Sequence, residues 1–378
     1  MIRLVILALF FLFSLLTIVR PQAYLLWIAS ILVSEFSWVF AGITLFIVVS
    51  GCWVESYRLV GTVTGVAAFL LFLSPIARAY IAGRRVDQDF DAAWGIKEEP
   101  GEDIKPRPFS FRNLFAGLNE KEIPYQTLTY SMHAGIPLTL DFYPSSTEGK
   151  RPCIIVVHGG SWSSGNSREL PELNSILAGS GYHVASINYR LAPGCKCPLP
   201  VEDVCEAFAY LKKHCGQLGI DTSSFVLLGR SAGGQIALLA AYTLQEPGLR
   251  GVIGFYAPAD MVWGYSLPAN PWIMDSRKVM RDYLGGSYEE CPEKYVASSP
   301  LEAASNRSVP TLLIHGRQDV LVAYEHSIRL RSKLVKDGVK CFLLSLPWAT
   351  HGFDYNIHGP GGQLSTYIVK RFLHEITR

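Results

Sequence analysis

A serine flanked by glycines is the feature of the sequence that most clearly suggests chemistry. Ser231 stands in the string Gly-Arg-Ser-Ala-Gly at 229–233, directly after a short apolar run and directly before a longer one. A strand that turns sharply into a helix exposes such a serine, and glycines two positions away on either side relieve crowding in the turn. The string is weak evidence by itself, but its place between a predicted strand and a predicted helix makes Ser231 a candidate nucleophile.

A serine hydroxyl needs a base to take its proton, and the base needs an acid to orient it. We expect His351 to be the base, because it follows the last apolar run of the chain. We expect Asp319 to be the acid, since it completes the chain order serine, acid, histidine. Asp354 is the alternative acid, but it lies only three residues after His351, so we expect it at the surface or at a helix cap.

A pair of glycines could stabilise the negative charge that forms when a serine attacks a carbonyl group. Gly159 and Gly160 follow His158 and another short apolar run. Without side chains, their N–H groups and that of Ala232 can approach an oxyanion closely, so we expect these three residues to form an oxyanion hole. The alternative is a simple turn.

Short apolar runs alternating with helical stretches must position these residues. The first two runs flank a turn at Ala134-Gly135 and predict an antiparallel pair, and the later continuous runs are typical of strands buried on both faces. The alternation predicts a mostly parallel sheet with helices on both faces, which binds ligands at the carboxyl ends of its strands. The predicted strands are 126–131, 137–143, 153–157, 183–188, 225–228, 251–255, 311–314 and 341–346, and the predicted helices are 170–178, 201–214, 232–244, 325–336 and 363–376.

One interval between predicted strands is long enough to form an insertion. Residues 261–304 are rich in Trp and Tyr, and we expect about this range to form a small cap over the site. Its aromatic side chains could line an apolar acyl pocket. Plain packing of a loop is the alternative for each of them. The aromatic residues in question are Trp263, Tyr265, Trp272 and Tyr283.

Residues 1–82 differ from the rest because they contain few charges. Only 17% of the 378 residues are charged, against about 25% in a typical soluble domain. The apolar stretches are 4–19, 21–34, 36–54 and 59–77, and the last two approach the roughly 20 residues that cross a bilayer core. We predict a transmembrane region with three spans, or four if 21–34 also crosses. A cleaved signal peptide would explain only the first stretch, and a buried soluble helix would show a polar face.

The arginines near these stretches predict an orientation. Arg78, Arg84 and Arg85 follow the last stretch, on the side that carries the predicted sheet. Lys and Arg are enriched in cytoplasmic flanks, so we expect that part of the chain to face the cytoplasm.

Residues 83–122 read as a linker, because prolines and charge runs such as 97–99 and 102–103 appear there. Within it, apolar residues at helical spacing in 109–118 predict a short amphipathic helix. This helix would lie on the bilayer surface or pack on the globular part, and we favour packing. The predicted division is therefore 1–82, 83–122 and 123–378.

Composition also excludes some classes of function. The net charge of +2 and the lack of a basic cluster argue against nucleic-acid binding. No pair of cysteines has the spacing of a zinc site, so no metal is expected, and nothing implies an organic cofactor. We expect Cys195 and Cys197 to be loop thiols, although a disulfide to Cys205 or Cys215 stays open.

Taken as a set, the motifs resemble those of a known family. His158-Gly-Gly-Ser-Trp, Asn188-Tyr-Arg-Leu-Ala-Pro, the serine string, His315-Gly-x-x-Asp and His351-Gly-Phe resemble the acetyl esterase/lipase branch of the α/β-hydrolases, over about residues 123–378. The resemblance includes hormone-sensitive-lipase-like and feruloyl-esterase-like enzymes. It implies an α/β-hydrolase fold, a Ser231–Asp319–His351 triad and an oxyanion hole at Gly159, Gly160 and Ala232. The sequence departs from lipase-type relatives at Ser161, in place of a third glycine, and at Arg230, before the serine.

These observations predict a membrane-anchored serine hydrolase that cleaves a small-molecule or lipid-like carboxylic ester through an acyl-serine intermediate. The same triad could instead cleave amides, as a formamidase or a serine peptidase does. A catalytically idle membrane scaffold with a hydrolase fold is a third hypothesis, which the complete set of candidate residues disfavours.

Overall fold

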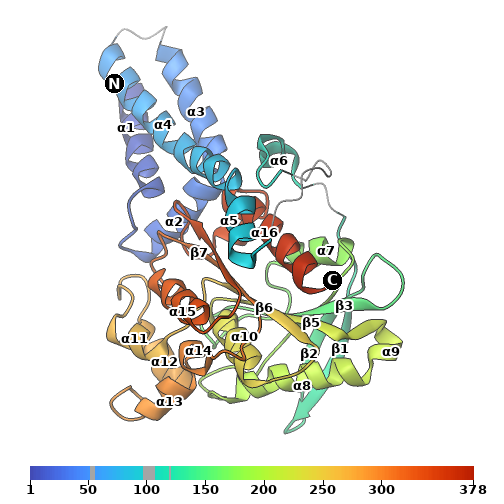
Figure 1. Ribbon diagram of the computed structural model, residues 1–378. Coiled ribbons are helices and arrows are strands. Elements are labelled where there is room, and N and C mark those ends of the chain that lie inside the picture. The colour runs from blue at the N-terminus through green and yellow to red at the C-terminus, as the bar shows by residue number, and fades with distance from the viewer. Residues whose placement is uncertain (52–55, 97–106, 119–120) are drawn as a thin grey trace.

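The computed structural model describes residues 1–51, 56–96, 107–118 and 121–378. It contains a sheet with helices on both sides, called here the α/β region (residues 126–378), and a group of long helices that rises from it (Figure 1). This second group, residues 2–83, is called the helical region. The charge runs at 97–99 and 102–103 lie outside the described residues.

Eight strands form one sheet in the order β1-β2-β4-β3-β5-β6-β7-β8. β2 pairs antiparallel with β1 and β4, and every other neighbouring pair is parallel, so the mostly parallel sheet is confirmed. The strands are β1 (Gln126–His133), β2 (Ile136–Tyr143), β3 (Arg151–Val157), β4 (His183–Ile187), β5 (Ile220–Arg230), β6 (Leu249–Phe255), β7 (Thr311–Gly316) and β8 (Cys341–Leu346).

Two apolar cores, one on each face, hold the sheet between helices. In β3, Ile155 packs into one core, whereas its neighbours Ile154 and Val156 pack into the other, as the pleat of a strand requires. The predicted helices all occur. They are α7 (Pro171–Gly179), α8 (Leu199–Lys213), α10 (Ala232–Thr243), α15 (Glu325–Lys336) and α16 (Pro360–Ile376), and the short α9 (Cys215–Leu218) follows α8.

Part of the predicted linker forms a second helix, which we did not expect from the sequence. α5 (Val86–Trp94) buries Val86, Phe90 and Trp94 against the sheet beside β8, where the Phe90 ring meets Phe342 edge-on. These three residues are spaced four apart and lie on one face of the helix. The acidic face of α5 is held by Arg371 of α16, which pairs with Asp87 and Asp91.

The short helix predicted in 109–118 is present as α6 (Phe111–Ala116). Leu114 is buried, while the rings of Phe111 and Phe115 contact Tyr80 and Trp38 of the helical region. Leu114 belongs to the apolar core that also holds sheet residues, as expected for packing on the globular part, whereas the two rings contact the helical region.

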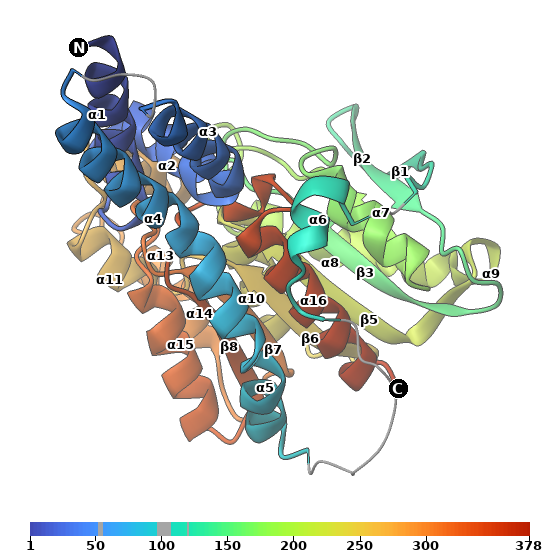
Figure 2. The same cartoon turned by 90° about the horizontal axis from the view of Figure 1, so that it is seen from above.

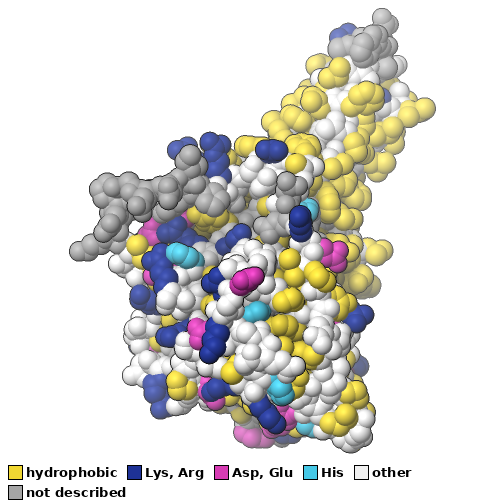
Figure 3. Space-filling model, turned by 90° about the vertical axis from the view of Figure 1, so that its right-hand side faces the viewer, with side chains coloured by type: hydrophobic (Ala, Val, Ile, Leu, Met, Phe, Trp, Pro, Cys, Tyr) yellow, Lys and Arg dark blue, Asp and Glu magenta, His cyan; other side chains and the backbone are white. Residues whose placement is uncertain are grey.

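The helical region has an up-and-down path (Figures 1 and 2). α1 (Ile2–Ser14) and the short η1 (Leu15–Thr17) lead toward the α/β region, and α2 (Tyr24–Glu35) lies at the base. α3 (Ser37–Ser50) leads away again, and α4 (Arg58–Gly83) returns and packs against α16. Much of the surface of the protruding helices is apolar (Figure 3).

Among the described helices, the run Arg58–Trp94 is long and apolar enough to cross a membrane. α2 and α3 would pass the same test together, but they are bent by 81° at their junction, and Ile2–Thr17 is shorter. The described residues thus offer one candidate span, or two spans if the bent pair α2–α3 is counted as a single span. The structure does not support the expected three or four spans.

A buried acidic side chain joins the two regions. Glu35, at the end of α2, accepts hydrogen bonds from Gly361 N at 2.8 Å and from Trp348 Nε1 at 3.2 Å. Its backbone oxygen accepts another from Asn356 Nδ2 at 2.7 Å. This acid in an otherwise apolar stretch therefore docks α2 onto the α/β region.

The interval 261–304 forms four short helices beside the carboxyl ends of the strands (Figure 1). They are α11 (Met261–Ser266), α12 (Ser276–Leu284), α13 (Pro292–Ala297) and α14 (Pro300–Ala303).

Candidate active site

Ser231 occupies a sharp turn between β5 and α10, with φ at +52°. A non-glycine residue in this conformation stores strain of order 1–3 kcal/mol, which commonly marks a functional site. A Cβ on Gly229 would lie 2.1 Å from the oxygen of Gly233, and a Cβ on Gly233 would lie 2.2 Å from the oxygen of His158. Both positions therefore require glycine, for the reason that the spacing suggested.

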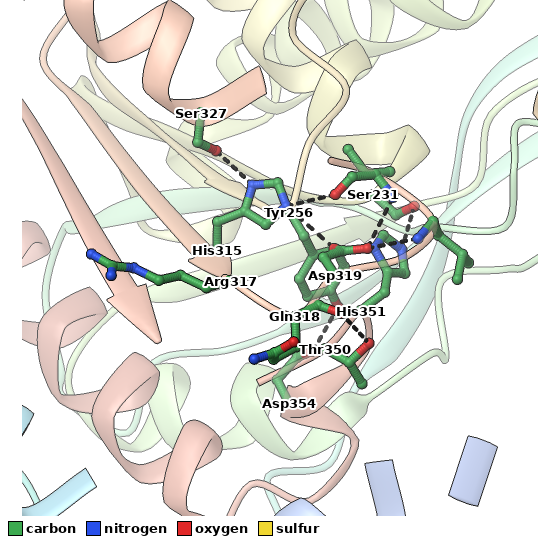
Figure 4. Close-up of polar contacts among 12 residues, drawn as sticks. Ser231, Tyr256, His315, Arg317, Gln318, Asp319, Ser327, Thr350, His351 and Asp354 are labelled. Carbon is green, nitrogen blue, oxygen red and sulfur yellow. Dashed lines mark hydrogen bonds and ion pairs between the residues drawn. The ribbon is translucent and has the colours of Figure 1, made fainter. Parts of the chain in front are cut away.

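A chain of hydrogen bonds links Ser231, His351 and Asp319 (Figure 4). His351 Nε2 lies 2.9 Å from Ser231 Oγ, and His351 Nδ1 lies 2.8 Å from Asp319 Oδ2. Because the carboxylate can only accept, the proton of the neutral ring belongs on Nδ1, which leaves Nε2 free to accept from the serine. The structure thus brings together the three residues that the sequence singled out.

The carboxylate of Asp319 is held ionised and fixed in place. Its Oδ1 accepts from the N–H groups of Leu321 and Val322, both at 2.9 Å. Burial alone would raise the pKa of Asp319, but the interactions with His351 and His315 outweigh it and hold the pKa well below its usual range. His315 Nε2 lies 3.2 Å from Asp319 Oδ2, so this second histidine supports the acid.

Asp354 is neither exposed nor a helix cap, so the expectation for it was wrong. It is 4% exposed, and its Oδ2 accepts from Arg230 Nε at 2.6 Å. Its Oδ1 accepts from the Tyr256 hydroxyl at 2.5 Å, and the Tyr256 ring lies 4.3 Å from that of His351. Arg230, the unusual residue before the serine, therefore forms a buried ion pair beneath the site, and its pKa is raised: burial would lower it, but Asp354 outweighs that effect.

The predicted oxyanion residues lie around Ser231. A Cβ on Gly159 would come within 3.6 Å of Ser231 Cβ, and Ala232 follows the serine directly. Gly160 has φ at +106°, and a Cβ there would lie 2.1 Å from the oxygen of Ser164. The loop therefore folds back on itself in a way that only glycine permits at this position.

His158 anchors the same loop. Its ring stacks on Tyr189 at 4.3 Å, and Nδ1 lies 2.7 Å from the oxygen of Gly159. Burial lowers the pKa of His158 to about 4, so the ring is neutral at physiological pH and its Nδ1–H donates to that oxygen. His158 thus holds the glycine loop and is not placed to act on Ser231.

A pocket of about 230 Å³ opens above Ser231. Ser161, Met261 and Met274 contribute to its wall, whereas none of the four aromatic residues considered for an acyl pocket does so. Tyr283, for example, is fully buried and stacks on Trp162 at 4.5 Å. Plain packing therefore describes the buried Tyr265 and Tyr283, whereas Trp272 is 80% exposed.

The segment between α1 and α2 also lines the pocket, which sequence reasoning missed. Arg20, Pro21 and Gln22 belong to the wall. The oxygens of Gln22 accept from Asn270 Nδ2 at 3.1 and 3.2 Å. Trp27 Nε1 donates to the backbone oxygen of His351 at 3.2 Å. The helical region therefore contacts the candidate site directly. No local pattern in the sequence indicates these contacts.

The cysteines and the potential metal ligands lie apart from this pocket. Cys195 and Cys197 are free thiols, and so are the other cysteines that the structure describes. Within the described residues, one group with metal-ligand spacing is formed by His133, Asp203 and Glu206. These atoms already interact with one another, since His133 Nε2 lies 2.9 Å from Glu206 Oε2.

The sheet order, the strained serine and the histidine–aspartate pair define an α/β-hydrolase. A family model described as BD-FAE matches residues 140–334, just over half of the chain. The chain therefore belongs to the BD-FAE family, within the esterase/lipase branch that its motifs resemble.

Curated relatives agree with this assignment. Esterase LipC of Mycobacterium tuberculosis is 28% identical and aligns with 60% of this chain and 59% of its own length. Lipase 2 of a Moraxella strain is 23% identical over 68% of this chain and 69% of its own. The chain thus spans about three fifths of the length of LipC.

Solved structures agree in fold. A bacterial heroin esterase has a TM-score of 0.60, with 23% identity over 70% of this chain and 87% of its own. A hyperthermophilic esterase from Pyrobaculum calidifontis has a TM-score of 0.58, with 23% identity over 68% and 87%.

Proposed function

We propose that the protein hydrolyses carboxylic esters through an acyl-serine intermediate. The observation that carries the proposal is the hydrogen-bonded chain from Ser231 through His351 to Asp319 at the floor of a pocket. The names of the curated relatives, which include an esterase and a probable carboxylic ester hydrolase, support the same chemistry.

The reaction follows from this geometry in two halves. Ser231 Oγ attacks the ester carbonyl carbon while His351 Nε2, at 2.9 Å, takes the hydroxyl proton. The ionised carboxylate of Asp319 stabilises the imidazolium that results. When the tetrahedral intermediate collapses, His351 returns the proton to the departing alcohol. Water then attacks the acyl-serine by the same steps, releasing the acid and restoring the serine.

The oxyanion of each tetrahedral intermediate needs fixed donors. In the proposed mechanism these are the backbone N–H groups of Gly159, Gly160 and Ala232. Donors held in place before the reaction cost no reorganisation as charge develops, and losing one typically costs about a hundredfold or more in rate. The strained loop conformation at Gly160 is consistent with this role.

We further propose that the helical region anchors the protein in a membrane. Support comes from the apolar side chains that α1, α3 and α4 turn outward, such as Phe46 at 76% and Leu59 at 77% exposure. An apolar surface of this extent marks a membrane or protein contact. The arginine distribution supports a cytoplasmic α/β region.

An amphiphilic ester drawn from the bilayer is the substrate class that this arrangement favours. The pocket wall includes Arg20–Gln22, directly below the apolar helices. Nearby side chains are apolar and exposed, including Leu25 at 77% and Trp272 at 80%. Trp is enriched at membrane interfaces, where its amphipathic ring suits the headgroup level.

Ester and amide cleavage can be separated with matched substrates on the full-length protein. We expect turnover of p-nitrophenyl butyrate that disappears in Ser231→Ala and persists in Ser332→Ala, a change at an exposed serine of α15. Preference for a formyl-amide or peptide substrate would identify an amidase. The absence of any Ser231-dependent turnover would overturn the proposal.

Two further assays test the anchoring and the substrate class. Resistance of the full-length protein to alkaline extraction from membranes would support anchoring, and release into the supernatant would refute it. Higher kcat/KM for a long-chain ester in mixed micelles than for a short soluble ester would support a membrane substrate, and equal values would refute it.

A further inference from the structure

A second hollow lies at the base of the helical region, away from Ser231. It runs between the helix pair α4–α5 and the edge of the α/β region formed by β8 and α15, and Figure 2 shows these elements side by side. Its volume is about 770 Å³. None of the residues of the proposed hydrolysis lines it, so it requires an explanation of its own.

The lining of this groove carries mostly positive charge. Four arginines line it and Asp89 is the one acid among its described lining residues; the arginines are Arg78, Arg85, Arg317 and Arg331. Arg85 and Arg331 are exposed, and neither side chain forms a hydrogen bond or ion pair with any residue that the structure describes. Free guanidinium groups that face one hollow are suited to bind an anion such as a phosphate.

The floor of the groove is apolar. Ile81, Val86, Ile328 and Phe342 contribute to it, and Ile81 is 55% exposed on the side that continues along α4. A soluble anion would gain nothing from this surface. An amphiphile with an anionic head and apolar chains would use the arginines and the apolar floor together.

The position along α4 fits the headgroup layer of a bilayer. Twenty residues separate Arg58 from Arg78, which at 1.5 Å per residue is about 30 Å, the thickness of a hydrocarbon core. With that segment in the core, Arg78 and Arg85 lie at the level of the lipid headgroups. Basic pockets at this level on the cytoplasmic side recognise anionic lipids.

We propose that this groove binds an anionic phospholipid, with the phosphate at Arg85 and Arg331 and the acyl chains along the exposed side of α4. The bound lipid would fix the angle at which the α/β region sits on the membrane, and with it the approach of substrate to the pocket. The proposal rests on the membrane anchoring proposed above but not on the ester chemistry.

The test is a binding titration of the full-length protein in neutral detergent micelles, with fluorescent phosphatidylglycerol as the probe and phosphatidylcholine as the zwitterionic comparison. Micelles are used so that a failure of anchoring in membranes does not decide the result. The site variant is Arg85→Gln/Arg331→Gln. The matched control is Arg250→Gln/Arg307→Gln, which removes the same charge at exposed positions in β6 and just before β7, outside the lining of the groove.

We expect wild-type protein and control to prefer phosphatidylglycerol, and the site variant to bind it about tenfold more weakly. Asp89→Asn, which removes the acid from the groove, is expected to tighten binding of phosphatidylglycerol a few-fold. This variant tests the proposal independently if the double variant fails to fold. Equal binding by the site variant and the wild type would overturn the proposal. So would equal weakening in the control, which would indicate only general attraction, or displacement of the lipid by millimolar inorganic phosphate.

Discussion

The two regions of this protein are both rich in apolar residues but place them on opposite sides. In the α/β region, Ile154 and Val226 are fully buried between the sheet and its helices. In the helical region, Phe46 and Leu59 project outward with three quarters of their surface exposed. A soluble domain closes its apolar surface around a core, whereas helices in lipid can leave it open. We therefore expect the hydrolysis to take place in the α/β region. The exposed apolar surface of the helical region is expected to determine the surroundings of the candidate site.

The two regions meet at the candidate site and not at a separate linker. Arg20–Gln22 line the pocket, Trp27 bonds the backbone of His351, and Glu35 is buried under α16. The proposed membrane anchor therefore also contributes part of the pocket wall. The contact implies that the position of the helices influences access to Ser231.

The largest effect is expected on kcat/KM when a residue of the candidate site is replaced, compared with a residue elsewhere in the molecule. His351→Ala should reduce kcat/KM on p-nitrophenyl butyrate by about 10⁴-fold or more, because Ser231 loses its base. The control is His374→Ala, at an exposed histidine of α16, which should leave kcat/KM unchanged. Retention of a tenth of the activity by His351→Ala would mean that another group is the base.

The glycine loop provides the next test. Gly160→Ala should lower kcat by about a hundredfold or more, because its Cβ would lie 2.1 Å from the oxygen of Ser164 and move the oxyanion donors. Gly338→Ala is a matched control, since Gly338 also has positive φ but has open space around its Cβ. That control should lose about 1 kcal/mol of stability and no activity. Equal kinetic losses in both variants would contradict the assigned role.

The contacts between the two regions are expected to contribute to the thermal stability of the protein. Glu35→Ala removes the acceptor for Trp348 Nε1 and Gly361 N, and each buried donor left unpaired costs about 1–3 kcal/mol. We expect a clear fall in the Tm of the full-length protein in detergent, with a smaller fall for Glu35→Gln, which keeps an acceptor. An unchanged Tm in Glu35→Ala would show that the two regions are joined only loosely.

The smallest expected effect concerns pH. The folded pKa of Asp319 is depressed, so the stability that its ionisation contributes is present above the unfolded pKa of about 3.9 and is lost as pH falls through the lower folded value. The contribution of the Asp319 carboxylate to the difference in Tm between wild type and Asp319→Asn should therefore persist down to pH 5 and be lost only below about pH 4. A difference already lost above pH 5 would contradict the low pKa of Asp319.

Features with local signals could be predicted from the sequence. The position of Ser231 depends on glycines two residues away, and His351 and Asp319 follow strands whose apolar runs are continuous. Helices such as α15 and α16 can be predicted because they alternate with the apolar runs of the strands.

Features that depend on distant partners could not be predicted. The prediction of a linker rests on prolines and charge runs beyond residue 96, and nothing local to α5 indicates that Asp87 and Asp91 pair with Arg371, some 280 residues later. Asp354 pairs with Arg230 across 124 residues. Neither spacing nor composition carries that information, and the same is true of the pocket wall formed by 20–22.

The central claim is that Ser231 is an activated nucleophile, and a fluorophosphonate probe tests it most directly. Such a probe reacts with a serine only when a neighbouring base activates its hydroxyl. We predict that the full-length protein is labelled, that mass spectrometry finds the adduct on the peptide containing Ser231, and that Ser231→Ala abolishes labelling. An unlabelled native protein, or labelling that persists in Ser231→Ala, would contradict the account.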